Sequence, residues 1–123
     1  MKVNIYSIYS TLHNEELLTK QRNDLMKDLS SMTGFSYQLT DIDDLYKGDL
    51  ALILVESGGS EHYFKQIEDR IKYPCYLLTF GNSNSLAASI EILSYILNKN
   101  EKGEILHGSN EYIAERIKDL MGK

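Results

Sequence analysis

Two nearly continuous apolar runs constrain the fold of this chain more than any other feature. They are DLALILVE, residues 49–56, and YPCYLLTF, residues 73–80. An apolar run without alternation is typical of a central parallel strand, because helices cover both faces of a parallel sheet. Each run is followed by small polar residues and then by a helical pattern. This order indicates an α/β protein.

The rest of the chain continues the alternation of strand and helix patterns. Apolar residues at helical spacing predict four helices, and β-rich or alternating runs predict three further strands. The expected strands are 2–9, 35–40, 49–56, 73–80 and 104–107, and the expected helices are 14–32, 61–71, 85–97 and 109–121. Residues 41–48 are expected to form an acidic connector or a single helical turn. Five βα units in 123 residues predict one doubly wound αβα domain over residues 1–123, with a five-stranded parallel sheet in the flavodoxin-like order 2-1-3-4-5.

The third expected helix is the most apolar one, and its buried face can be predicted from spacing. Leu86, Ile90, Leu93 and Leu97 fall on one face, and Ile92 and Ile96 lie beside it. We therefore expect these four leucine and isoleucine side chains to face the sheet. The single cysteine, Cys75, lies within an apolar run and is expected to be a buried small hydrophobe.

Charge and composition exclude several classes of function. The formal net charge is −5 and no basic stripe is visible, so nucleic acid is not an expected partner. No apolar run approaches the ~20 residues that span a membrane, and the first ten residues do not resemble a signal peptide. The expected location is therefore the cytoplasm. One cysteine cannot form an internal disulfide or a cysteine-based metal site.

Three small polar segments are expected to meet at one edge of the sheet. In open parallel sheets, ligands bind beyond the carboxyl ends of the strands where the strand order reverses. Here that point lies between the first and third strands. The candidate ligand-binding residues in these segments are Ser10, His13, Ser57, Gly58, Gly59, Ser60, Glu61, Asn82, Ser83, Asn84 and Ser85.

Each of these segments also has a purely structural interpretation. In SGGSE the glycines allow a tight turn, Ser60 caps a helix and Glu61 lies in the favourable first turn. Alternatively, the glycine N–H groups and the helix start cradle an anion or a sugar hydroxyl. GNSNS is longer than a cap requires, and its hydroxyl and amide groups suit a polyhydroxy ligand or a polar contact with another domain or subunit. Neither a glycine-rich phosphate fingerprint nor a metal-ligand cluster is present.

The two apolar strands with their polar turns resemble the N-terminal domain of the L-fucose/L-arabinose isomerase-like family. The resemblance is carried by LILVESGGSE and by YPCYLLTFGNSNSLAASIEILSYI. A GG-x-E-like turn and an N-S-L-x-A-x-E-like helix start are typical of that family. The matching residues here are Gly58, Gly59, Glu61, Asn84, Ser85, Leu86, Ala88 and Glu91. The closing segment HGSNEYIAERIKDLMGK also resembles the end of that domain.

The resemblance implies a domain without the catalytic centre. Members of the family are aldose–ketose isomerases, in which a divalent metal, often Mn²⁺, is held by later domains. This chain is therefore expected to be inactive alone and to need no cofactor, with Mn²⁺ relevant only if the catalytic domains exist. A sugar or another small polar ligand, and a homo-oligomer or further domains, are the expected partners. The alternative is a small flavodoxin-like enzyme or carrier for a phosphorylated or nucleotide ligand.

Overall fold

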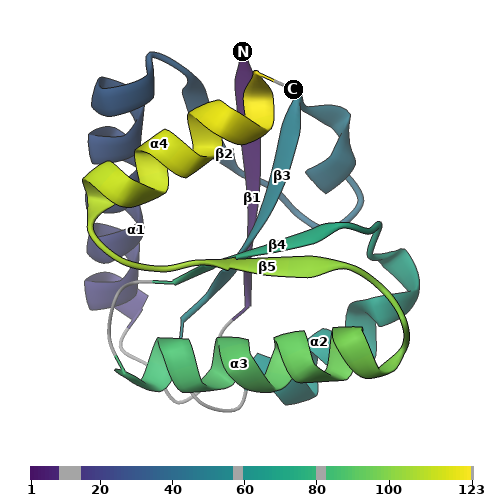
Figure 1. The fold of residues 1–123 in the computed structure, drawn as a ribbon. Helices are drawn as coiled ribbons and strands as arrows, with labels where there is room; N and C mark the ends of the chain where they lie inside the picture. The colour runs from purple at the N-terminus through teal and green to yellow at the C-terminus, as the bar shows by residue number, and fades with distance from the viewer. Residues whose placement is uncertain (9–14, 57–59, 80–82, 123) are drawn as a thin grey trace.

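The computed structural model describes residues 1–8, 15–56, 60–79 and 83–122, and it confirms the α/β architecture. One sheet contains five parallel strands in the order β2-β1-β3-β4-β5 (Figure 1). The strands are β1 (Lys2–Ile8), β2 (Ser36–Leu39), β3 (Leu50–Val55), β4 (Cys75–Thr79) and β5 (Gly103–Leu106). The helices are α1 (Glu15–Thr33), α2 (Ser60–Ile67), α3 (Ser83–Asn98) and α4 (Asn110–Met121).

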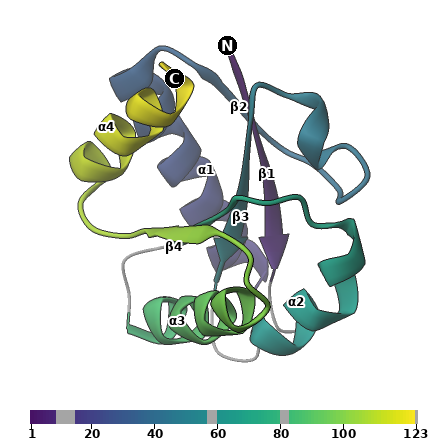
Figure 2. The same ribbon diagram turned by 45° about the vertical axis from the view of Figure 1, so that its right-hand side comes forward.

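The four helices cover the two faces of the sheet in pairs. Figure 2 shows α1 and α4 on one side of the sheet and α2 and α3 on the other. Each face has its own apolar cluster, because successive strand residues point to opposite faces. Leu52 and Leu54 of β3 pack toward α1 and α4, whereas Ile53 and Val55 pack toward α2 and α3. The continuous apolar run in β3 is thus explained by burial on both faces.

Two short elements refine the predicted boundaries. The acidic connector contains the 3₁₀ turn η1 (Leu45–Lys47), whose Leu45 is fully buried. The expected helix over residues 61–71 is α2 followed by the 3₁₀ turn η2 (Glu68–Arg70). At the last helix, Ser109 is the N-cap, and its hydroxyl accepts a hydrogen bond from the Tyr112 N–H.

The predicted buried face of α3 was wrong by part of a turn. Ile90 and Leu97 are about half exposed, at 51% and 52%. The buried face instead follows a line of smaller residues that ends in two isoleucines: Ser85, Ala88, Ser89, Ile92 and Ile96. Spacing alone favoured the stripe of large side chains. The small residues are buried because the start of α3 lies close against the sheet, where its serines bond to main-chain groups.

Candidate functional site

The carboxyl ends of the central strands form the edge at which the sequence predicts a site. The order of the sheet reverses between β1 and β3, so the switch point lies where predicted. Helices α2 and α3 both begin at this edge (Figure 1). Of the predicted residues, Ser10, His13, Ser57, Gly58, Gly59 and Asn82 lie outside the described residues, as does the side chain of Ser83.

Two of the predicted residues, Ser60 and Ser85, are fully buried and tie helix starts to strand ends. The Ser60 hydroxyl donates to the carbonyl oxygen of Ile8, the last residue of β1, over 3.4 Å. The Ser85 hydroxyl donates to the carbonyl oxygen of Val55, the last residue of β3. Both contacts fit the structural interpretation of these serines, because each hydroxyl bonds to a main-chain carbonyl at the end of a strand and so holds a helix start against the sheet.

We expect Ser85→Ala to lower the free energy of unfolding by about 1–3 kcal/mol, because the buried Val55 carbonyl would lose its donor. Chemical denaturation of the two proteins measures this difference. Ser94→Ala, at an exposed position of the same helix, is the matched control and should change stability by less than about 0.5 kcal/mol. Equal effects of the two substitutions would contradict a structural role for the Ser85 hydroxyl.

The other two described candidates, Glu61 and Asn84, lie in the first turns of α2 and α3. Glu61 is half-buried and Asn84 is exposed. Their side chains differ from those of Ser60 and Ser85 in facing at least partly toward solvent. Together they place a carboxylate and an amide at the edge where the two helices begin.

Sequence reasoning missed a buried ion pair at this edge. Glu56 directly follows β3, and its side chain is completely buried. Arg22 of α1 contacts both carboxylate oxygens, with Nε 2.5 Å from Oε1 and Nη2 3.1 Å from Oε2. Ser7 of β1 donates its hydroxyl proton to the same Oε1. The Glu56 N–H also donates to the Ile8 carbonyl, which holds the end of β3 against β1.

A second polar pair lies at the carboxyl ends of β4 and β5. Thr79, the last residue of β4, is buried, and its Oγ1 lies 2.7 Å from Nδ1 of His107. His107 directly follows β5 and is half-buried. The sequence offered no partner for this histidine, because the two residues are 28 positions apart and meet only through the parallel pairing of β4 with β5.

The described residues support neither a metal site nor a reactive thiol. Within residues 1–8, 15–56, 60–79 and 83–122, no group of three or more His, Cys, Asp or Glu side chains is placed to hold a metal ion. Cys75 is buried as predicted, and burial raises the pKa of its thiol to about 12. At neutral pH the thiol therefore stays protonated and is a poor nucleophile.

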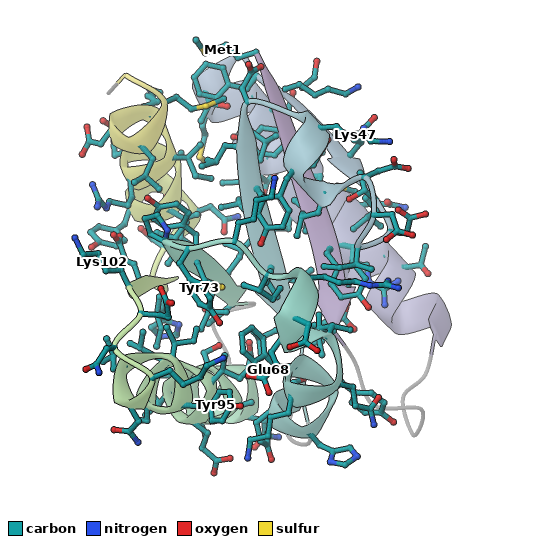
Figure 3. All side chains as sticks on the ribbon, turned by 90° about the vertical axis from the view of Figure 1, so that its right-hand side faces the viewer. Met1, Lys47, Glu68, Tyr73, Tyr95 and Lys102 are labelled. Atoms are coloured by element: carbon teal, nitrogen blue, oxygen red, sulfur yellow. The ribbon has the colours of Figure 1, made fainter. Side chains whose placement is uncertain are left out.

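A cavity of about 300 Å³ lies at the opposite edge, between the amino ends of β3 and β4. Its walls include Tyr46, Ala51, Lys72, Tyr73, Cys75 and Tyr76. Figure 3 looks onto this side of the molecule, with Lys47 of η1 above and Tyr73 below. The sequence motifs point to the carboxyl edge alone, and no sequence pattern predicted this cavity.

Comparison with known proteins identifies no relative of this chain. No family model, curated protein or solved structure matches it. None of the described helices is long and apolar enough to cross a membrane.

Proposed function

We propose that this chain is a carbohydrate-binding domain of the sugar-isomerase N-terminal type. It binds a small polyhydroxy ligand at the carboxyl edge around β1, β3 and β4, and it acts within a homo-oligomer or a larger protein that supplies any catalytic centre. The motif resemblance and the position of the switch point support this proposal. Fold alone does not define function, so the proposal also depends on the residues of the site.

The observation that carries the proposal is the buried cluster of Ser7, Arg22 and Glu56. Burying an ion pair costs desolvation, and a buried pair often adds little net stability. Its value here is positional, because three elements, β1, β3 and α1, meet at one carboxylate. A binding edge needs such fixed supports if its hydrogen-bonding groups are to keep their geometry.

The groups near this support suit a neutral polar ligand. Asn84 offers both a donor and an acceptor, and Glu61 offers acceptors. A sugar presents hydroxyl groups that donate and accept, so each of these two side chains can bond to such a hydroxyl. Each residue lies in the first turn of a helix, where main-chain N–H groups provide further donors.

Calorimetry with L-fucose and L-arabinose tests the proposal. We expect binding heat from the native protein, and at least tenfold weaker binding by Asn84→Ala, since an unpaired sugar hydroxyl costs about 1.4 kcal/mol or more. Asn98→Ala is the matched control, because Asn98 is an exposed residue at the other end of α3. Its affinity should equal that of the native protein.

Two results would reject the proposal. One is the absence of heat with either sugar, and the other is an affinity that Asn84→Ala leaves unchanged. Inorganic phosphate and sugar phosphates belong in the same titration series. Binding of the phosphates without binding of the free sugars would favour the flavodoxin-like carrier of a phosphorylated ligand instead.

A further inference from the structure

The cavity at the amino ends of β3 and β4 exists because these two strands diverge. In Figure 1, β3 begins near the top of the view, whereas β4 begins at the right-hand side of the view. The paired residues of β3 and β4 start at Ile53 and Leu77, so Ala51 lies two positions ahead of the ladder. The gap between the strands is the cavity.

Main-chain groups of β3 point into this gap. In a parallel ladder the N–H and C=O of one residue point to the same neighbouring strand, and those of the next residue point to the opposite one. The Glu56 N–H donates to Ile8 of β1. Since the direction alternates from residue to residue, the main-chain groups of Ala51 and Ile53 point to β4. Ala51 therefore directs a donor and an acceptor toward the space that β4 has left.

Tyrosine rings line the gap, and hydrogen bonds hold one of them, Tyr46, in place. Tyr46, Tyr73 and Tyr76 contribute to the walls. The Tyr46 hydroxyl accepts from the Lys72 N–H at 2.9 Å and donates to the Lys72 carbonyl at 3.4 Å, which fixes η1 against the segment before β4. Rings of this kind favour a flat, unsaturated ligand.

The charges near the cavity are already engaged. The Lys72 ammonium lies 5.4 Å from the centre of the Tyr46 ring, and the Asp49 carboxylate accepts from the Lys2 N–H at 2.7 Å. Lys99, which is 6.0 Å from the Tyr73 ring, forms an ion pair with Glu68 at 2.7 Å. One cation and one anion in the lining balance each other, so a neutral ligand fits better than an ion.

Few side-chain polar groups remain to satisfy a ligand rich in hydroxyls. The Tyr46 hydroxyl and the Asp49 carboxylate are bonded to the main chain. The Tyr73 hydroxyl is buried and has no hydrogen-bond partner among the described residues. A sugar would leave several hydroxyls unpaired here, whereas a flat ring with one donor–acceptor edge would not. The volume of about 300 Å³ is at the small end of ligand pockets.

We propose that the gap between the amino ends of β3 and β4 binds a small, neutral, planar nitrogen heterocycle of the nucleobase type. The donor–acceptor edge of the heterocycle pairs with the N–H and C=O of Ala51, which β4 leaves unpaired. The faces of the heterocycle pack against the tyrosine rings. This site is separate from the carboxyl edge and does not depend on the sugar-binding function.

Titration of ¹⁵N-labelled protein with adenine tests this site directly. We expect the amide signals of Ala51, Tyr73 and Cys75 to shift together in a saturable way. Phenol has a ring but lacks the donor–acceptor edge of a heterocycle, so it should bind at least tenfold more weakly. Absence of shifts around the gap at saturating adenine, or equal affinity for phenol, would overturn the proposal.

Variants locate the ligand within the gap. Ala51→Met places a larger side chain in the wall and should weaken adenine binding at least tenfold. Ala87→Met, at an exposed position of α3, is the matched control and should bind normally. Lys47→Ala removes an exposed ammonium outside the lining of the gap and should leave adenine binding unchanged, because the ligand is neutral. A folded Ala51→Met protein with native affinity, or a tenfold loss in Lys47→Ala, would contradict the assignment.

Discussion

Glu56→Ala is expected to lower the free energy of unfolding by about 3–5 kcal/mol, because it removes the buried carboxylate that balances the charge of the Arg22 guanidinium. The Arg22 side chain is only 13% exposed, so water can replace little of the lost interaction with the carboxylate. The Ser7 hydroxyl would also lose its acceptor. Chemical denaturation, followed by circular dichroism, measures the change.

The chain has a matched control for this substitution. Arg116 and Glu104 form an ion pair with similar geometry, at 2.5 and 2.6 Å, but their side chains are 29% and 31% exposed. Glu104→Ala should therefore cost no more than about 1 kcal/mol. Similar losses from Glu56→Ala and Glu104→Ala would show that burial does not determine the effect.

A double variant separates stability from positioning. Replacing both charges at once, with Arg22→Met and Glu56→Leu, removes the ion pair without leaving one charge alone. Such replacements are often neutral or stabilising. We expect the double variant to recover most of the stability lost in Glu56→Ala but to bind sugars at least tenfold more weakly. Full recovery of both properties would mean that the pair has no role at the binding edge.

The topology could be predicted from the sequence because its signals are local and repeated. The apolar runs of β3 and β4, and the regular spacing of helices between strands, leave few alternatives for a parallel sheet. The face of α3 was harder to predict because spacing identified a stripe of large side chains. The close approach of the helix to the end of β3, which decides the outcome, depends on Ser85 and Val55 meeting in three dimensions.

The polar contacts were predicted less well, for a physical reason. Glu56 closes an apolar strand and stands out as a charge there, whereas Arg22 lies in the polar segment TKQRND and has no distinguishing sequence context. Their pairing spans 34 positions and requires the crossover from β1 through α1 to be placed against β3. The cavity at the amino ends has no local signal, since it arises from the divergence of two strands.

The two edges of the sheet offer different chemistry. The carboxyl edge combines a buried ion pair with an exposed amide and a half-buried carboxylate at the helix starts, which suits hydroxyl-rich ligands. The amino edge combines tyrosine rings with strand main-chain groups, which suits a flat heterocycle. Because the proposed sites lie at opposite ends of β3, loss of one ligand in a variant need not affect the other.

Phe64→Ala is expected to cost about 3–5 kcal/mol, the range for removing a large buried aromatic side chain. Phe64 is fully buried, and its ring packs edge-to-face on Tyr95 with centroids 6.4 Å apart. Within Ser60–Ile67, Ser60 and Phe64 are the two buried residues. Phe64 is thus the one fully buried apolar side chain of this helix, and the partly buried Tyr63 and Ile67 pack against the same cluster.

The loss should be visible locally as well as globally. Hydrogen exchange of the α2 amides is expected to accelerate more than that of the β3 amides, because a short helix that has lost its one fully buried apolar side chain can open without the sheet. Leu97→Ala, at a half-exposed position of α3, is the control and should cost less than Phe64→Ala by at least about 2 kcal/mol. Uniform acceleration across α2 and β3 would show that α2 unfolds only with the whole domain. In that case the helix start at Ser60 and Glu61 would be as rigid as the sheet, and the carboxyl edge would be preformed for its ligand.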